Sequence, residues 1–156
     1  MSRHAVILFD ANVLVASLDL DASGHPASRA VVSAAQRRRL PGVLMPQVLL
    51  EAYAVITDAR RVAEPLTPGQ AWMELEALAH VIPVVWPDRR ALIELAGVIE
   101  RHVPKAQGVF DAFLVAQMRA AGIGTICTYN VSDFSQYQGI NPEPPEGILA
   151  RLRLPD

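Results

Sequence analysis

The chain has 156 residues, of which 51% are hydrophobic and 19% charged, and its formal net charge is −2. This composition excludes a disordered chain, and the net charge gives no sign of a strongly basic nucleic-acid-binding surface. The only cysteine, Cys127, excludes an internal disulfide and a cysteine-based zinc site. No apolar run reaches about 18 residues and no signal-peptide pattern is present, so we expect a cytoplasmic protein without a membrane anchor.

The first predicted element is an apolar run at residues 6–9 that leads directly into Asp10. An apolar run without alternation is typical of a strand buried on both faces, as in parallel sheets. A short helix is expected at residues 12–19 and an alanine-rich helix at 27–39, followed by a short strand at 43–45.

The rest of the chain continues the alternation of strands and helices. Further strands are expected at residues 81–86 and 125–128, and the tail at 139–147 is expected to add an edge strand and a turn of helix. The remaining helices are expected to begin at Pro46, at Thr67 and Pro68, after Asp88, and at Val109. This alternation predicts one α/β domain over residues 1–156, with a mostly parallel sheet and helices on both faces.

Four acidic residues lie at element ends or among apolar neighbours: Asp10, Glu51, Asp111 and Asp133. Because strand ends and the adjoining helix starts meet at one edge of a parallel sheet, we expect these acids to converge. Crowded carboxylates repel one another, and a divalent cation that prefers oxygen ligands, Mg²⁺ or Mn²⁺, would hold them together.

Each acid also has a purely structural interpretation. Asp10 is a favoured N-cap for the helix that follows it. Asp111 fits a first-turn acid that complements the helix dipole, and Asp133 fits an Asx turn. Glu51 could pair with one of the arginines at 60–61 or with a partner chain.

Arginine supplies nearly all of the positive charge, in clusters at residues 37–39, 60–61 and 89–90. One interpretation places these clusters at helix ends, where cations favour the C-terminal dipole. The other makes them a rim that contacts phosphate, because the guanidinium fork matches phosphate geometry.

Four segments together resemble the PIN-domain ribonucleases, and within them the VapC-type toxins of toxin–antitoxin pairs. These segments are FDANVL at 9–14, PQVLLE at 46–51, VFDAFLVA at 109–116, and TYNVSDF at 128–134, which is followed by Gly139 and Ile140. Their order and spacing cover nearly the whole chain.

The resemblance implies a fold and a set of site residues. The fold is a three-layer α/β/α sandwich of PIN type around a central sheet of four or five strands. The implied metal-binding and catalytic residues are Asp10, Glu51, Asp111 and Asp133. The polar residues implied to line the site are Asn12, Thr128 and Asn130.

The implied activity is Mg²⁺- or Mn²⁺-dependent hydrolysis of RNA by the toxin of a type II toxin–antitoxin pair. The implied partners are the RNA substrate, a small antitoxin protein and a second copy of the chain. Ala11 departs from the family pattern, in which Thr or Ser is common, yet no carboxylate is lost, so we expect activity to persist. His25 falls where relatives often have a loop histidine, although a simple helix-start residue is the favoured interpretation.

Two alternatives remain at this point. The chain could be a catalytically weakened PIN-like module that binds RNA or protein. A phospho-aspartate mechanism at Asp10 is disfavoured, because Asn12 stands where that chemistry usually needs a second aspartate.

Overall fold

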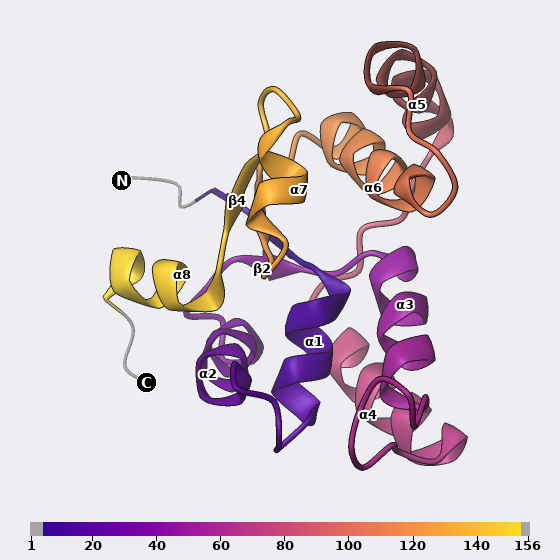
Figure 1. Cartoon of the computed structure of the whole chain (residues 1–156). Helices are drawn as coiled ribbons and strands as arrows, with labels where there is room; N and C mark the ends of the chain where they lie inside the picture. The colour runs from indigo at the N-terminus through magenta and orange to yellow at the C-terminus, as the bar shows by residue number, and fades with distance from the viewer. Residues whose placement is uncertain (1–4, 154–156) are drawn as a thin grey trace.

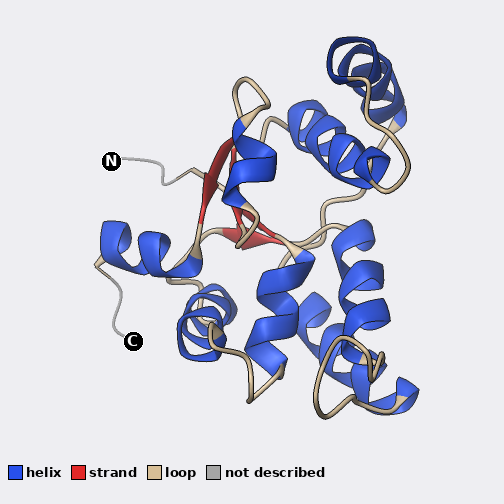
Figure 2. Cartoon of the chain, in the orientation of Figure 1, coloured by secondary structure: helices blue, strands red, loops and turns tan. Residues whose placement is uncertain are grey.

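The computed structural model describes residues 5–153, and it places a small parallel sheet of four strands among helices (Figures 1 and 2). The strands are β1 (Ile7–Phe9), β2 (Gly42–Val43), β3 (Thr125–Cys127) and β4 (Asn141–Glu143). The helices are α1 (Ala11–Leu18), α2 (His25–Gln36), α3 (Pro46–Ile56), α4 (Pro68–Val81), α5 (Arg89–His102), α6 (Gly108–Ala121), α7 (Val131–Ser135) and α8 (Pro145–Leu152). Helices α1 to α4 gather toward the bottom of Figure 1, and α5, α6 and α7 lie toward the top. The predicted α/β class with a parallel sheet is confirmed.

The two central strands are β1 and β3, because the strand order is β2-β1-β3-β4. Phe9, the last residue of β1, is paired with Cys127, the last residue of β3. All three residues of β1 are fully buried, as the apolar run predicts. The sheet extends from β1 to β2 on one side and from β3 to β4 on the other. The carboxyl ends of β1 and β3 therefore form a topological switch point, where open α/β sheets bind ligands.

Close packing around β2 depends on a glycine. A Cβ atom at Gly42 would lie 2.5 Å from Cε2 of Phe9 and 2.8 Å from Cβ of Ala35. A larger residue would therefore force β2 away from both β1 and α2.

The predicted strand at residues 81–86 is wrong in length. Val81 still belongs to α4, and the segment contributes one parallel bridge between Leu44 and Val84. Leu44 donates its N–H to the Pro83 carbonyl and accepts from the N–H of Val85. The segment thus lies at the β2 edge of the sheet, a position where a proline such as Pro83 is tolerated.

Helix boundaries follow the local signals with two exceptions. Thr67 forms a capping box with Gln70, and Asp88 caps α5, as predicted. Helix α2 ends at Gln36 instead of Arg39, because Arg38 takes a left-handed backbone conformation with φ of 57°. The short helix α7 was not predicted.

Within residues 5–153, no helix is both long enough and apolar enough to cross a lipid bilayer.

Candidate active site

Asp10 is the first residue after β1 and the N-cap of α1, and only 6% of its surface is exposed. Its Oδ1 accepts a hydrogen bond from the Ala11 N–H at 2.7 Å. Its Oδ2 accepts from the Thr128 hydroxyl at 2.7 Å and from the Asn12 amide at 3.3 Å. A carboxylate offers about four acceptor positions, so one position on Oδ1 is left for a further partner. The N-cap interpretation is confirmed, and capping leaves part of the acceptor capacity of the carboxylate available for another partner.

Thr128 joins the ends of the two central strands. Its buried hydroxyl donates to Asp10 and accepts from the Asn12 amide at 3.2 Å and from the Asn130 N–H at 3.0 Å. A hydroxyl has one donor and two acceptor positions, so this one is fully used. The side-chain amide oxygen of Asn12, Oδ1, accepts in turn from the Tyr129 N–H at 3.2 Å. These bonds hold the Asp10 carboxylate in a single orientation.

Glu51 lies half-buried on α3, and a glutamine one turn earlier holds it. The Gln47 amide nitrogen donates to Oε1 of Glu51 at 2.8 Å and to the Phe110 carbonyl at 2.8 Å. The Gln47 amide oxygen accepts from the Gln117 amide at 2.7 Å. Because Phe110 precedes Asp111, these bonds connect α3 with the acid-bearing start of α6.

The sequence did not single out Gln47 or Gln117 as functional, because the candidate site residues were the four acids and the polar residues at positions 12, 128 and 130. The available signal was a polar residue inside an apolar helix, since Gln117 stands between Ala116 and Met118. Gln117 is 2% exposed, and a buried amide requires hydrogen-bond partners.

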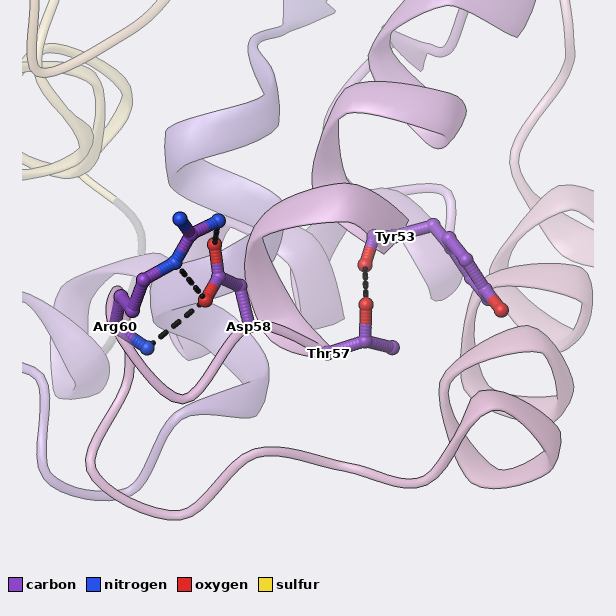
Figure 3. A network of polar contacts seen from close by, with 4 residues as sticks. All are labelled: Tyr53, Thr57, Asp58 and Arg60. Atoms are coloured by element: carbon purple, nitrogen blue, oxygen red, sulfur yellow. Dashed lines mark hydrogen bonds and ion pairs between the residues drawn. The ribbon is translucent and has the colours of Figure 1, made fainter.

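The Arg60 guanidinium binds Asp58 instead of Glu51. Its Nε donates to Oδ1 of Asp58 at 3.0 Å and its Nη2 to Oδ2 at 2.9 Å (Figure 3). The hydrogen bonds from Arg60 lower the pKa of Asp58 to about 2. In the same view, the Thr57 hydroxyl donates to the Tyr53 carbonyl at the end of α3. The hypothesis that Arg60 pairs with Glu51 is therefore wrong.

The other two arginine clusters differ in position. The cluster at 37–39 lies at the C-terminal end of α2, where Arg37 is the C-cap, as the helix-end interpretation predicts. Arg90 binds the N-cap Asp88 at the start of α5, so the cluster at 89–90 is not at a helix C-terminus. Arg38 and Arg39 line a pocket with Gly42, the first residue of β2. That pocket is at the amino end of the strand, on the opposite edge of the sheet from Asp10, which argues against an arginine rim at 37–39 around the acids.

Asp111 lies in the first turn of α6, and Asp133 is exposed in the first turn of α7. An open pocket of about 460 Å³ adjoins Asp111 and Glu51. Its other lining residues are Gln107, Gly108 and Phe110. The pocket gives a solvent path to two of the four acids.

Burial raises the pKa of three of the four acids, and the charges of neighbouring acids add to the rise for two of them. Burial raises the pKa of Asp10, and the hydrogen bonds from Thr128 and Ala11 partly offset this. Burial also raises the pKa of Glu51; the Gln47 hydrogen bond opposes this rise, and the charges of Asp10 and Asp111 add to it.

Asp111 lies within electrostatic range of two other acids. Its pKa is raised first by burial and then by the charges of Asp10 and Asp133. Carboxylates from four different elements therefore influence one another, although their role as metal ligands stays a prediction.

The donor atoms at this edge suit a hard divalent cation. All the candidate ligands are oxygen atoms, and Cys127 beneath them is a buried thiol whose pKa is raised by burial. In the part of the chain that the structure describes, no three His, Cys, Asp or Glu side chains form a ready-made cluster. Mg²⁺ keeps several of its waters and is usually bound through one or two carboxylates, so the arrangement fits such an ion chemically.

Two further residues complete the placement of the sequence-predicted candidates. His25 is the first residue of α2, and its Nδ1 lies 2.8 Å from the Ala16 carbonyl oxygen, so the helix-start interpretation is confirmed. Asn130 is the N-cap of α7; its exposed side chain makes no cap bond, while its N–H donates to Thr128.

The sequence matches the model of the PIN domain over residues 7–140. The chain belongs to the PIN-domain family. No curated protein matches it in sequence.

Several solved structures share the fold at low sequence identity. DNA-bound VapBC from Salmonella typhimurium has a TM-score of 0.67 at 15% identity, over 90% of this chain and 98% of that one. VapC20 from Mycobacterium tuberculosis, described as a sarcin–ricin loop cleaving toxin, has a TM-score of 0.63 at 18% identity, over 87% and 99%. A toxin–antitoxin complex from Klebsiella pneumoniae has a TM-score of 0.60 at 17% identity, over 89% and 97%. At these identities the likeness is one of fold.

Proposed function

We propose that this chain, as a single PIN-like domain over residues 1–156, is a Mg²⁺- or Mn²⁺-dependent endoribonuclease and the toxin of a type II toxin–antitoxin pair. The observation that carries the proposal is the mutual influence of Asp10, Glu51 and Asp111 at the switch point of the sheet, beside an open pocket. Membership of the PIN-domain family and the fold shared with a sarcin–ricin loop cleaving toxin support it.

The residues have distinct proposed roles in phosphodiester hydrolysis. Asp10 and Asp111 hold the cation, and Glu51 and Asp133 position the attacking water or a second cation. When bound, the cation lowers the pKa of the attacking water and neutralises charge that develops on the phosphate. Thr128 keeps the Asp10 carboxylate in its orientation through a 2.7 Å hydrogen bond.

Cleavage of a mixed RNA pool tests this function. The wild type should cleave RNA in Mg²⁺ or Mn²⁺ and stop when EDTA is added, and Asp10→Ala should be inactive. Asp58→Asn is the matched control, because Asp58 is paired with Arg60 away from the candidate site. Cleavage that continues unchanged in EDTA would contradict the mechanism, and metal-independent RNA binding without cleavage would favour the weakened binding module.

The proposed antitoxin contact is an apolar groove of about 600 Å³ between α3, α4 and the segment after Val84. Leu50 is 65% exposed and Trp86 is 74% exposed in this groove, which is unusual for large apolar side chains unless a partner covers them. Leu50→Glu should weaken binding of the antitoxin encoded beside this chain and leave RNA cleavage intact.

The proposed homodimer contact is the outer face of α5. Leu92, Ile93 and Ile99 are exposed on this helix. Leu92→Glu should convert a dimer into a monomer in light scattering, and a wild type that is monomeric at all concentrations would contradict this part of the proposal.

A further inference from the structure

A chain of side-chain amides connects the first turn of α3 with α6. Figure 1 shows the first turns of these helices next to each other. The chain begins at Gln117, whose amide nitrogen donates to Oε1 of Gln47 at 2.7 Å. It ends at two acceptors, Oε1 of Glu51 and the Phe110 carbonyl, each 2.8 Å from Nε2 of Gln47.

The chemistry of these groups permits one orientation of the Gln47 amide. A carboxylate oxygen and a backbone carbonyl are acceptors, so both must face the amide nitrogen and its two hydrogens. The Gln47 oxygen must then face a donor, and the Gln117 amide provides it. A reversed amide would place an oxygen against two acceptors, and it would leave the buried Gln117 donor facing another donor.

The fixed Gln47 amide determines the orientation of the Glu51 carboxylate and the position of the backbone that carries Asp111. Oε1 of Glu51 is committed to Gln47, which leaves Oε2 to act on a cation, a water molecule or substrate. The same nitrogen holds the carbonyl of Phe110, the residue directly before Asp111. One side chain therefore links the Glu51 carboxylate to the backbone that carries Asp111.

We propose that Gln47 and Gln117 are positioning residues that set the arrangement of Glu51 and Asp111 for divalent-cation binding, with Gln117 acting through Gln47. The inference rests on the proposed metal-dependent function and assigns it two residues that are not themselves acids. Partners of metal ligands typically contribute about 10- to 100-fold to metal affinity or activity.

The test compares Gln47→Met, Gln117→Met and the double variant with the wild type. Methionine matches the length of glutamine and favours helices, but it cannot form these hydrogen bonds. Gln36→Met, at the end of α2, is the control for the same substitution elsewhere. Two quantities are measured: the Mn²⁺ affinity obtained from the dependence of Tm on Mn²⁺ concentration, and the Mn²⁺ dependence of single-turnover RNA cleavage.

Gln47→Met should weaken Mn²⁺ binding by about 10- to 100-fold in both measurements. Gln117→Met should act in the same direction. The double variant should bind Mn²⁺ no more weakly than Gln47→Met alone, because Gln117 acts through Gln47.

A comparison of Tm with Mn²⁺ affinity distinguishes a positioning role of the two glutamines from a purely structural one. Gln47→Met leaves the buried Gln117 amide without its acceptor and should lower Tm, whereas the double variant removes both polar groups and should recover part of that loss. Recovery of Tm without recovery of Mn²⁺ affinity supports positioning. Recovery of both together would overturn it.

Failure of this inference is distinguishable from failure of the proposed function. If the wild type cleaves RNA with metal and the glutamine variants keep its Mn²⁺ dependence, the positioning role is wrong and the nuclease stands. If the wild type binds Mn²⁺ without cleaving RNA, the nuclease proposal fails, and the thermal shifts still decide the role of the glutamines. A wild type that neither binds Mn²⁺ nor cleaves RNA overturns both.

Discussion

The candidate site has two parts that are stabilised differently. The Asp10 half, formed by Asp10, Asn12 and Thr128, is held by hydrogen bonds at the ends of the two central strands. The Glu51 half, formed by Glu51, Asp111 and the two glutamines Gln47 and Gln117, lies between two helices beside an open pocket.

The difference between the halves is electrostatic. In the Asp10 half, donors from Thr128 and Ala11 offset part of the cost of burying a carboxylate. In the Glu51 half, burial and the charges of Asp10 and Asp133 all raise the pKa of Asp111. Hydrogen bonds within the chain therefore compensate part of the cost of the Asp10 carboxylate. A bound cation would lower the free energy of the Asp111 carboxylate most, because the charges around it are negative.

The largest expected effect comes from removing an acid of the Glu51 half. Asp111→Asn should reduce RNA cleavage by about 10³-fold or more, because a lost metal ligand costs several kcal/mol of transition-state stabilisation. The same variant should be at least as thermally stable as the wild type, since it removes a repelled charge. Single-turnover rates and Tm measure the two effects, and full activity in Asp111→Asn would remove this residue from the site.

The second prediction uses the pH dependence of stability. A carboxyl group whose pKa is raised on folding binds more protons in the folded state, so stability falls as pH rises from its unfolded pKa to its folded pKa. Asp10, Glu51 and Asp111 all have raised pKa values, so their ionisation destabilises the folded chain at neutral pH. Asp58 has a lowered pKa, about 2, because Arg60 binds it, so its ionisation favours the folded chain.

Mn²⁺ at 100 times its Kd should stabilise the wild type by about 2.7 kcal/mol at neutral pH, or roughly 5–10 °C in Tm. The shift should shrink as the pH falls and the acids become protonated, and Asp111→Asn should reduce it. Calorimetry with and without Mn²⁺ measures the shift. An equal shift at low and neutral pH would mean that the ion binds elsewhere.

The third prediction concerns the Asp10 half. Thr128→Val keeps the shape of the side chain and removes the hydroxyl, so Oδ2 of Asp10 loses its 2.7 Å donor, and the Asn12 amide and the Asn130 N–H each lose an acceptor. We expect a loss of about 1–3 kcal/mol in the free energy of unfolding and about 10- to 100-fold in cleavage. Thr128→Ser is the matched control, and it should retain most of both quantities. Chemical denaturation and cleavage rates are the measurements.

The smallest expected effect is at Ala11. Its backbone N–H already binds Asp10, so a hydroxyl added by Ala11→Ser supplements a carboxylate that three donors hold. We expect cleavage to change by less than about tenfold, or about 1.4 kcal/mol. A gain of about 100-fold or more would show that Ala11 limits catalysis and would favour the weakened-module alternative.

More of the Asp10 half than of the Glu51 half could be predicted from the sequence. The apolar run before Asp10 and the polar residues after β3 are local patterns, and pairing of the central strands brings their ends together. In the Glu51 half, the Gln47–Glu51 hydrogen bond lies within α3, but the bonds from Gln47 to the Phe110 carbonyl and from Gln117 to Gln47 cross between α3 and α6, where no strand pairing sets the register. No local pattern predicts those contacts, because they depend on how α3 and α6 approach each other.

The sequence by itself determined the alternation of strands and helices, the capping at Thr67 and Asp88, and the positions of the acids at element ends. These features depend on backbone sterics and on hydrogen bonds between near neighbours. Only the tertiary structure decided that Gln47 on α3 meets the Phe110 carbonyl and the Gln117 amide on α6. The physical reason is that a long polar side chain reaches several possible partners, and packing of the surrounding elements selects among them.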